Sequence, residues 1–86
     1  MELLERSAPL PLAATHPGLT ILGLHGRLTR VTRQDGAVLG YVELVDPASS
    51  NEDRPFLAKR LRPRAQGFLE VGRFWSADEA VDALRY

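Results

Sequence analysis

The sequence contains no cysteine and only two histidines. Without thiols, the chain cannot form a disulfide framework, a thiolate metal site or a cysteine nucleophile. Its longest nearly apolar stretch, residues 19–24, is far shorter than the ~20 residues that cross a bilayer. Acidic residues at the N-terminus also differ from the basic start of a secretory signal. We therefore predict a cytoplasmic protein with no metal site, no cofactor and no membrane partner.

Net charge is also lacking, because eleven basic residues balance eleven acidic ones in a chain of 86 residues. This length allows a single domain. Pro9, Pro11 and Pro17 break any long helix near the N-terminus and remove donors from any strand there. We predict that residues 1–18 form a partly mobile arm and that residues 19–86 form one small domain.

Alternating and β-branched patterns predict antiparallel strands in the middle of the chain. The expected strands cover residues 28–33, 37–45, 56–62 and 68–74. Asp35-Gly36 predicts a tight hairpin turn, because both residue types tolerate positive φ. Residues 46–55 and 63–67 carry turn formers, and Gly72 marks a bulge or a close backbone approach. Residues 19–22 have strand-like content whose pairing the sequence leaves open.

A short amphipathic helix follows the last expected strand. Ser76 and Glu79 have the spacing of a capping box, in which each side chain accepts a hydrogen bond from the other residue's amide. Apolar residues then recur with helical spacing at Ala77, Ala80, Val81 and Leu84. Trp75 precedes the cap, and we expect its indole to pack on Ala80 and close the core. The expected fold is α+β, an antiparallel sheet of three to four strands packed against one C-terminal helix.

Residues suited to catalysis are scarce. His16 and His25 could each act as a base or ligand, but neither has partners nearby in sequence, which favours solvated or simply packed side chains. Asp78 and Asp82 are spaced to share one exposed helix face, where a solvated role is favoured over a metal or acid–base cluster. We predict no catalytic residues and a protein that is not an enzyme.

The basic residues gather in the middle of the chain. Residues 1–26 and 74–86 are both net acidic, so residues 27–73 hold a net charge of +3. An arginine-rich sheet face could contact phosphates, and Phe68 or Trp75 could stack on a base. The candidate nucleic-acid-binding residues are Arg30, Arg60, Arg62 and Arg64. The alternatives are a solvated face balanced by nearby acids, or a protein-interaction or structural domain that dimerises through a strand edge or the leucine-bearing arm.

The segment 68–84 resembles the end of the sheet and the start of the helix in AP2-type DNA-binding domains, and phage-integrase arm-binding domains are similar. The positions that match are Gly72, Phe74, Ser76, Ala77, Glu79, Ala80 and Ala83. The resemblance implies a three-stranded antiparallel sheet packed on a C-terminal helix. No tryptophan lies in the early strands, so the DNA-reading residues of that family do not carry over. Residues 27–86 are also similar to short proteins of GC-rich actinobacteria, which implies a taxon and a shared fold.

Overall fold

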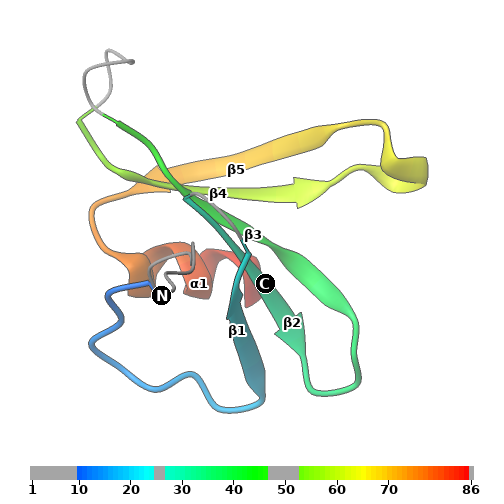
Figure 1. Cartoon of the computed structure of the whole chain (residues 1–86), viewed down its shortest axis with the longest axis horizontal. Coiled ribbons are helices and arrows are strands. Elements are labelled where there is room, and N and C mark those ends of the chain that lie inside the picture. Colours follow the sequence, from blue (N-terminus) through cyan, green and yellow to red (C-terminus); the bar gives the residue numbers. More distant parts are fainter. Residues whose placement is uncertain (1–9, 25–26, 47–52, 86) are drawn as a thin grey trace, which may run out of the picture.

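The computed structural model describes residues 10–24, 27–46 and 53–85 and contains one antiparallel sheet and one α-helix (Figure 1). The strands are β1 (Leu19–Gly23), β2 (Leu28–Arg33), β3 (Val38–Leu44), β4 (Phe56–Leu61) and β5 (Phe68–Phe74). A 3-10 turn, η2 (Pro63–Ala65), joins β4 to β5, and the helix α1 (Ala77–Arg85) follows. The strands pair in chain order, β1-β2-β3-β4-β5. The predicted α+β class is confirmed, with five strands instead of three to four.

The additional strand is β1, whose pairing the sequence left open. It runs antiparallel to β2 in a continuous register from Leu19 opposite Arg33 to Gly23 opposite Thr29. The alternation of Ile21, which packs against the core, with exposed Leu22 is the pattern of a strand covered on one face. β1 therefore extends the meander by one strand at its edge.

The hairpin turn between β2 and β3 forms at Asp35-Gly36, as predicted. Gly36 adopts a φ of +94°, and its N–H donates to the Arg33 carbonyl over 2.9 Å. The Arg33 N–H in turn donates to the Ala37 carbonyl over 2.7 Å. This pattern is a three-residue loop that needs a positive φ at the glycine alone. Asp35 stabilises the turn by accepting a hydrogen bond from the Ala37 N–H over 3.0 Å.

The core lies between one face of the sheet and α1, which contacts β3, β4 and β5. Its fully buried members come from the strands and from the apolar side of the helix: Val31, Val42, Phe56, Ala58, Ala77, Ala80, Val81 and Leu84. Gly40 allows the helix to come close, because a Cβ there would lie 2.7 Å from a Leu84 methyl carbon and 2.6 Å from the Lys59 carbonyl oxygen. The predicted apolar stripe of the helix is confirmed.

The start of α1 confirms the predicted capping box. The Ser76 N–H donates to the Glu79 carboxylate over 3.2 Å, and the Glu79 N–H donates to the Ser76 hydroxyl over 3.1 Å. The expectation that Trp75 closes the core is wrong, because Trp75 is 66% exposed. Phe74 packs against the core instead. Adjacent residues at the end of a strand point to opposite sides, so only one of the two aromatic rings can be covered.

The described part of the predicted arm lies against the domain. Leu10 and Leu12 are partly buried against the core, although prolines flank them in the sequence. The chain then reaches the N-terminal end of α1 before it turns into β1 (Figure 1). Residues 1–9 lie outside the described residues, and the mobility of the arm stays a prediction.

Candidate functional site

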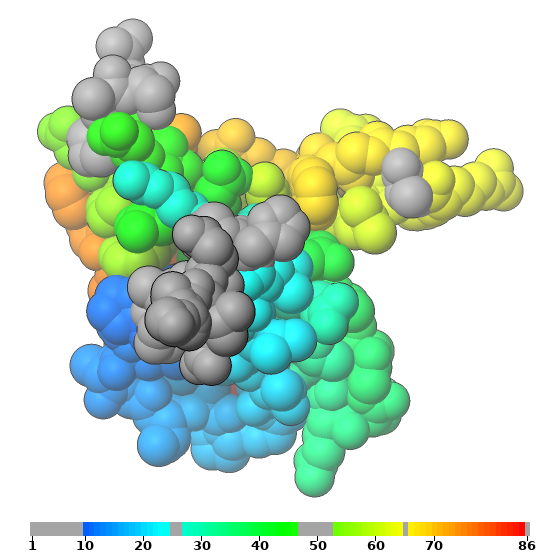
Figure 2. Space-filling view, in the orientation of Figure 1, coloured from blue at the N-terminus to red at the C-terminus, as the bar shows by residue number. Residues whose placement is uncertain are grey.

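The distal half of the β4–β5 hairpin, residues 60–69, projects from the body of the protein and is called the ribbon below. In Figures 1 and 2 it is the yellow-green to yellow segment that extends beyond every neighbouring strand. Its apolar side chains are exposed on both faces: Leu61 is 48%, Phe68 43% and Leu69 52% exposed. The ribbon is thus a two-stranded element whose apolar side chains stay about half exposed.

The sequence explains the end of the ribbon. Pro63 starts the 3-10 turn, and the Arg62 N–H donates to the Gly67 carbonyl over 2.8 Å to close the loop. Gly67 has a φ of +88°, which glycine adopts without strain. Arg64 has a φ of +61°, an uncommon conformation for a residue with a side chain. The loop therefore holds the two flanking arginines in a defined, partly strained turn.

Two of the four predicted nucleic-acid-binding residues, Arg62 and Arg64, lie at this end of the ribbon. Both are exposed. Among the described residues, neither side chain has a hydrogen bond or an ion pair. Between Arg60 and Leu69 the sequence has no acidic residue that could pair with them locally. These two arginines are the candidate anion-contacting groups that the structure leaves available.

Arg60, the first residue of the ribbon, directs its side chain to the helix side of the sheet. Its guanidinium donates to the carbonyl of Leu39 over 3.3 Å and to those of Ala83 and Leu84 over 3.4 and 3.2 Å. The last carbonyls of a helix have no intrahelical donor and carry partial negative charge, so a cation there stabilises the helix end. Arg60 therefore holds the C-terminal end of α1 and does not lie beside Arg62 on an open face.

Arg30 is also separated from the ribbon end. It lies in β2, directly opposite Tyr41, on the sheet face that α1 leaves uncovered. Its Nε is buried and has no hydrogen-bond partner. The structure thus brings Arg62 and Arg64 together and places Arg30 and Arg60 on opposite faces of the sheet.

The ribbon is fixed to the rest of the sheet by a small aromatic and charged cluster. The Phe68 ring meets Tyr41 edge-on, with ring centroids 5.3 Å apart. The Lys59 Nζ lies 4.5 Å from the Phe68 centroid and 2.7 Å from the Glu43 carboxylate. An ammonium over a ring is attracted to its π face. Tyr41 and Lys59 therefore hold the Phe68 ring against the sheet, whereas Trp75, the other proposed stacking residue, is the more exposed ring.

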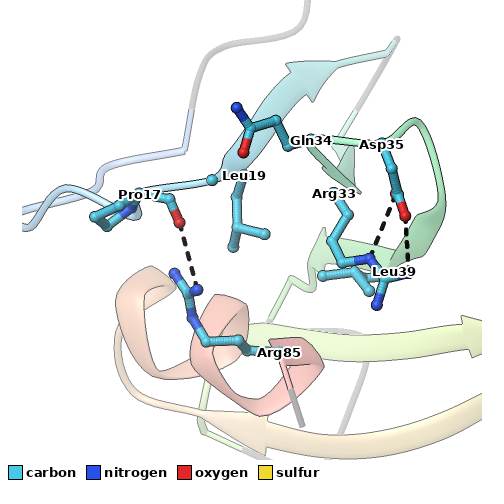
Figure 3. A pocket seen from close by; sticks show the side chains of 8 residues that line it. Pro17, Leu19, Arg33, Gln34, Asp35, Leu39 and Arg85 are labelled. Atoms are coloured by element: carbon cyan, nitrogen blue, oxygen red, sulfur yellow. Dashed lines mark hydrogen bonds and ion pairs between the residues drawn. The ribbon is translucent and has the colours of Figure 1, made fainter.

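A cleft of about 310 Å³ lies where the arm, the β2–β3 turn and the end of α1 meet (Figure 3). Arg33 faces Asp35, and the two side chains form paired hydrogen bonds of 3.1 and 3.4 Å. This guanidinium and the Ala37 N–H hold the pKa of Asp35 below its usual value, with the Ala37 bond the larger cause. Arg85 donates to the Pro17 carbonyl over 3.4 Å. The charged groups of the cleft are thus already bound to one another or to the backbone.

His16 and Asp78 form a clamp between the arm and the helix that the sequence did not indicate. The His16 Nε2 lies 2.7 Å from Asp78 and its Nδ1 lies 3.4 Å from Asp82, and the imidazole is only 5% exposed. Asp78 also accepts from the amides of Ala13 and Ala14 over 2.8 and 3.2 Å. These bonds, that of Ala13 first, lower the pKa of Asp78.

The interpretation of Asp78 as a purely solvated side chain is therefore wrong, while Asp82 is 60% exposed. His16 and Asp78 are 62 positions apart, so no local pattern could have paired them. Both imidazole nitrogens face carboxylates, and this arrangement anchors the arm. His25 lies outside the described residues.

Within residues 10–24, 27–46 and 53–85, no three His, Asp or Glu side chains are grouped so that they could hold a metal ion. Over the same residues, no helix is long and apolar enough to cross a membrane. Comparison with protein-family models, with curated proteins and with solved structures gave no match. The candidate functional site of this chain is therefore defined by its own geometry, and it is the ribbon.

Proposed function

We propose that this protein binds duplex nucleic acid through the ribbon. The observation that supports the proposal is the placement of Arg62 and Arg64, exposed and without side-chain partners among the described residues, at the end of a projecting hairpin. Cations at such a position reach a phosphate backbone without interference from the acidic parts of the molecule. Neutralising phosphates releases bound counterions, which drives binding.

The dimensions of the ribbon are compatible with a nucleic-acid groove. Two paired strands lie about 4.8 Å apart, and the major groove of B-DNA is about 12 Å wide and admits a two-stranded β-ribbon. Leu61 and Phe68 pair directly across the ribbon next to the turn. Their exposed apolar surface suits contact with thymine methyl groups. Arg62 and Arg64 would contribute affinity through phosphate contacts. Leu61 and Phe68 would lie closest to the bases.

The proposal is a binding role and not a catalytic one. His16 is the described residue best suited to proton transfer, but its two ring nitrogens face Asp78 and Asp82. A general base needs a free nitrogen within reach of the substrate proton. In the described residues, this histidine serves the contact between the arm and α1.

A salt titration tests the proposed function. A labelled duplex of about 20 base pairs is titrated with protein at several salt concentrations, and fluorescence anisotropy gives the binding constant. Two phosphate contacts predict a slope of log K against log salt of about −1.8, at about −0.9 per contact. Arg62→Ala should reduce the slope to about −0.9, and Arg62→Lys should leave it near the wild-type value because the charge is retained.

Arg33→Ala is the matched control. It removes the same charge from the turn of the other hairpin, where Arg33 is paired with Asp35, and should leave the slope unchanged. Equal effects of Arg33→Ala and Arg62→Ala would contradict a site on the ribbon. Absence of binding at about 100 μM protein in low salt would overturn the proposed function, because non-specific binders associate below that concentration.

A further inference from the structure

The sheet face opposite α1 is called the outer face here, and it is formed by two cross-strand rows. The register places Leu22, Arg30, Tyr41, Lys59 and Glu70 in one row across all five strands. The second row contains Leu28, Glu43, Leu57 and Arg73. The residues between them in sequence, such as Val31, Val42 and Ala58, are fully buried under the helix. Strand alternation therefore turns both rows away from α1.

The outer face mixes apolar and charged side chains. An antiparallel sheet covered on one side normally alternates between apolar core residues and polar outward residues. Here Leu22, Leu28, Tyr41 and Leu57 occupy outward positions, and Leu22 is 46% exposed. In each row a charged residue stands between two apolar ones, Arg30 between Leu22 and Tyr41 and Glu43 between Leu28 and Leu57. Apolar side chains interspersed with charges suit a polar protein interface.

Unpaired charges of opposite sign lie on either side of the centre of the first row. Arg30 is in the second strand and Glu70 in the fifth, and within the described residues neither side chain has a hydrogen bond or an ion pair. A buried nitrogen on each of Arg30 and Arg73 lacks an acceptor. The chain itself covers these two nitrogens, so a partner would meet the other nitrogens of each guanidinium and its positive charge.

We propose that the outer face binds a second copy of this chain, with the two sheets packed face to face about a twofold axis. An axis along the strands between β3 and β4 would lay β2 of one copy over β5 of the other. Arg30 would then face Glu70 of the other copy, and the symmetry would form this ion pair twice. Tyr41 would lie over Lys59 of the other copy, so the central contacts would be aromatic and cationic.

Known packing of sheets agrees with this arrangement. Two sheets that pack face to face keep their strand directions within about 30° of each other. In-plane axes along the strands and across them both keep the two sets of strands nearly aligned, but an axis across them along the first row would place Arg30 over Arg30 of the other copy. The charge signs therefore select the axis along the strands, about which the face is self-complementary.

Analytical ultracentrifugation of charge-reversal variants tests the dimer. The wild-type chain should be dimeric at about 100 μM, a concentration that saturates an interface of micromolar affinity. Arg30→Glu and Glu70→Arg should each weaken the dimer about tenfold or more, because like charges would then face each other. Arg27→Glu, a reversal at an exposed position just before β2, should leave the dimer intact.

Mixing the two variants provides the decisive measurement. An equimolar mixture of Arg30→Glu and Glu70→Arg should form a heterodimer, because each copy then presents the charge that the other lacks. Circular dichroism of each variant establishes that it is folded before mixing. A monomeric wild type at about 100 μM would overturn the proposal, as would folded variants that dimerise like the wild type or do not associate on mixing. None of these outcomes bears on the salt titration of Arg62.

Discussion

The two halves of the β4–β5 hairpin are built from the same two strands but have opposite environments. In the half near α1, Phe56 and Ala58 are buried and pair with Phe74 and Gly72. In the ribbon, Leu61 and Leu69 are about half exposed. Strand propensity is similar in both halves, so it does not cause the difference. The difference comes from how far α1 extends over the hairpin. The nine residues of α1 span about 14 Å, whereas the seven residues of β5 span about 23 Å. The helix is too short to cover the whole hairpin.

The largest expected effect comes from removing a side chain under the helix. Leu84→Ala should lower the free energy of unfolding by about 3 kcal/mol, because the methyl groups that pack on Gly40 are lost and leave a cavity. Leu69→Ala, the same substitution in the ribbon, should change it by less than about 0.5 kcal/mol. Urea unfolding followed by circular dichroism measures both. Similar losses at the two positions would mean that the ribbon is also covered.

A smaller effect on stability, which depends on pH, is expected when the contact between His16 and Asp78 is removed. The pKa of Asp78 is lowered from its ordinary value of 3.8 by the Ala13 amide, the His16 side chain and the Ala14 amide. The Asp78 carboxylate is therefore protonated at a higher pH in the unfolded chain than in the folded protein. Asp78 makes its full contribution to stability above pH 3.8. This contribution is lost as the pH falls through the lowered pKa that Asp78 has in the folded protein.

Asp78→Ala should therefore destabilise the protein at pH 7 and flatten the fall of stability between pH 5 and pH 2, a window of about three units around the ordinary carboxyl pKa. Thermal unfolding at a series of pH values measures this. Asp53→Ala, which removes an exposed carboxylate far from the clamp in the sequence, is the control and should leave the pH profile unchanged. If the Asp78 variant retained the wild-type pH profile, the clamp would not contribute to stability.

The helix start should show a moderate effect. Ser76→Ala should cost about 1 kcal/mol, because the hydroxyl that accepts from the Glu79 amide is removed. Denaturant unfolding gives the value. A loss below roughly 0.2 kcal/mol would indicate that water or another group replaces the cap.

The smallest effect is expected at Trp75. Although it is the largest side chain in the sequence, its 66% exposure predicts that Trp75→Ala changes stability by no more than about 0.5 kcal/mol. Tryptophan fluorescence of the wild type should also show strong quenching by iodide. A loss of several kcal/mol in the variant would place the indole against the core after all.

Features set by residues close together in the chain were predictable. The Ser76–Glu79 box, the Asp35-Gly36 turn and the bounds of β2 and β5 follow from local spacing and agree with the structure. The bulge expected near Gly72 lies beside it, where the register between β4 and β5 shifts. These elements depend on backbone conformation and alternation, which the sequence expresses directly.

Features set by distant residues were not predictable. The sequence placed Arg60 and Arg62 on one exposed face, but Arg60 binds carbonyls of α1 more than twenty positions away. The pairing of His16 with Asp78 likewise depends on where the arm returns to the helix. Strand alternation decides which of the adjacent rings of Phe74 and Trp75 packs against the core. It directs Phe74 to the core and Trp75 to the surface.

The position of α1 after all five strands in the chain has a consequence for synthesis in the cell. The apolar side of the sheet has no cover until the ribosome has added residues through Leu84, which packs on Gly40 in the third strand. The clamp likewise joins residues 13–16 to Asp78, which is made more than 60 residues later. Contacts between such distant positions form late, so we expect the nascent chain to expose this side until the helix has been made. The protein should therefore fold only after translation has delivered its helix, and a ribosome stalled before Ser76 should carry a chain that proteases cleave readily.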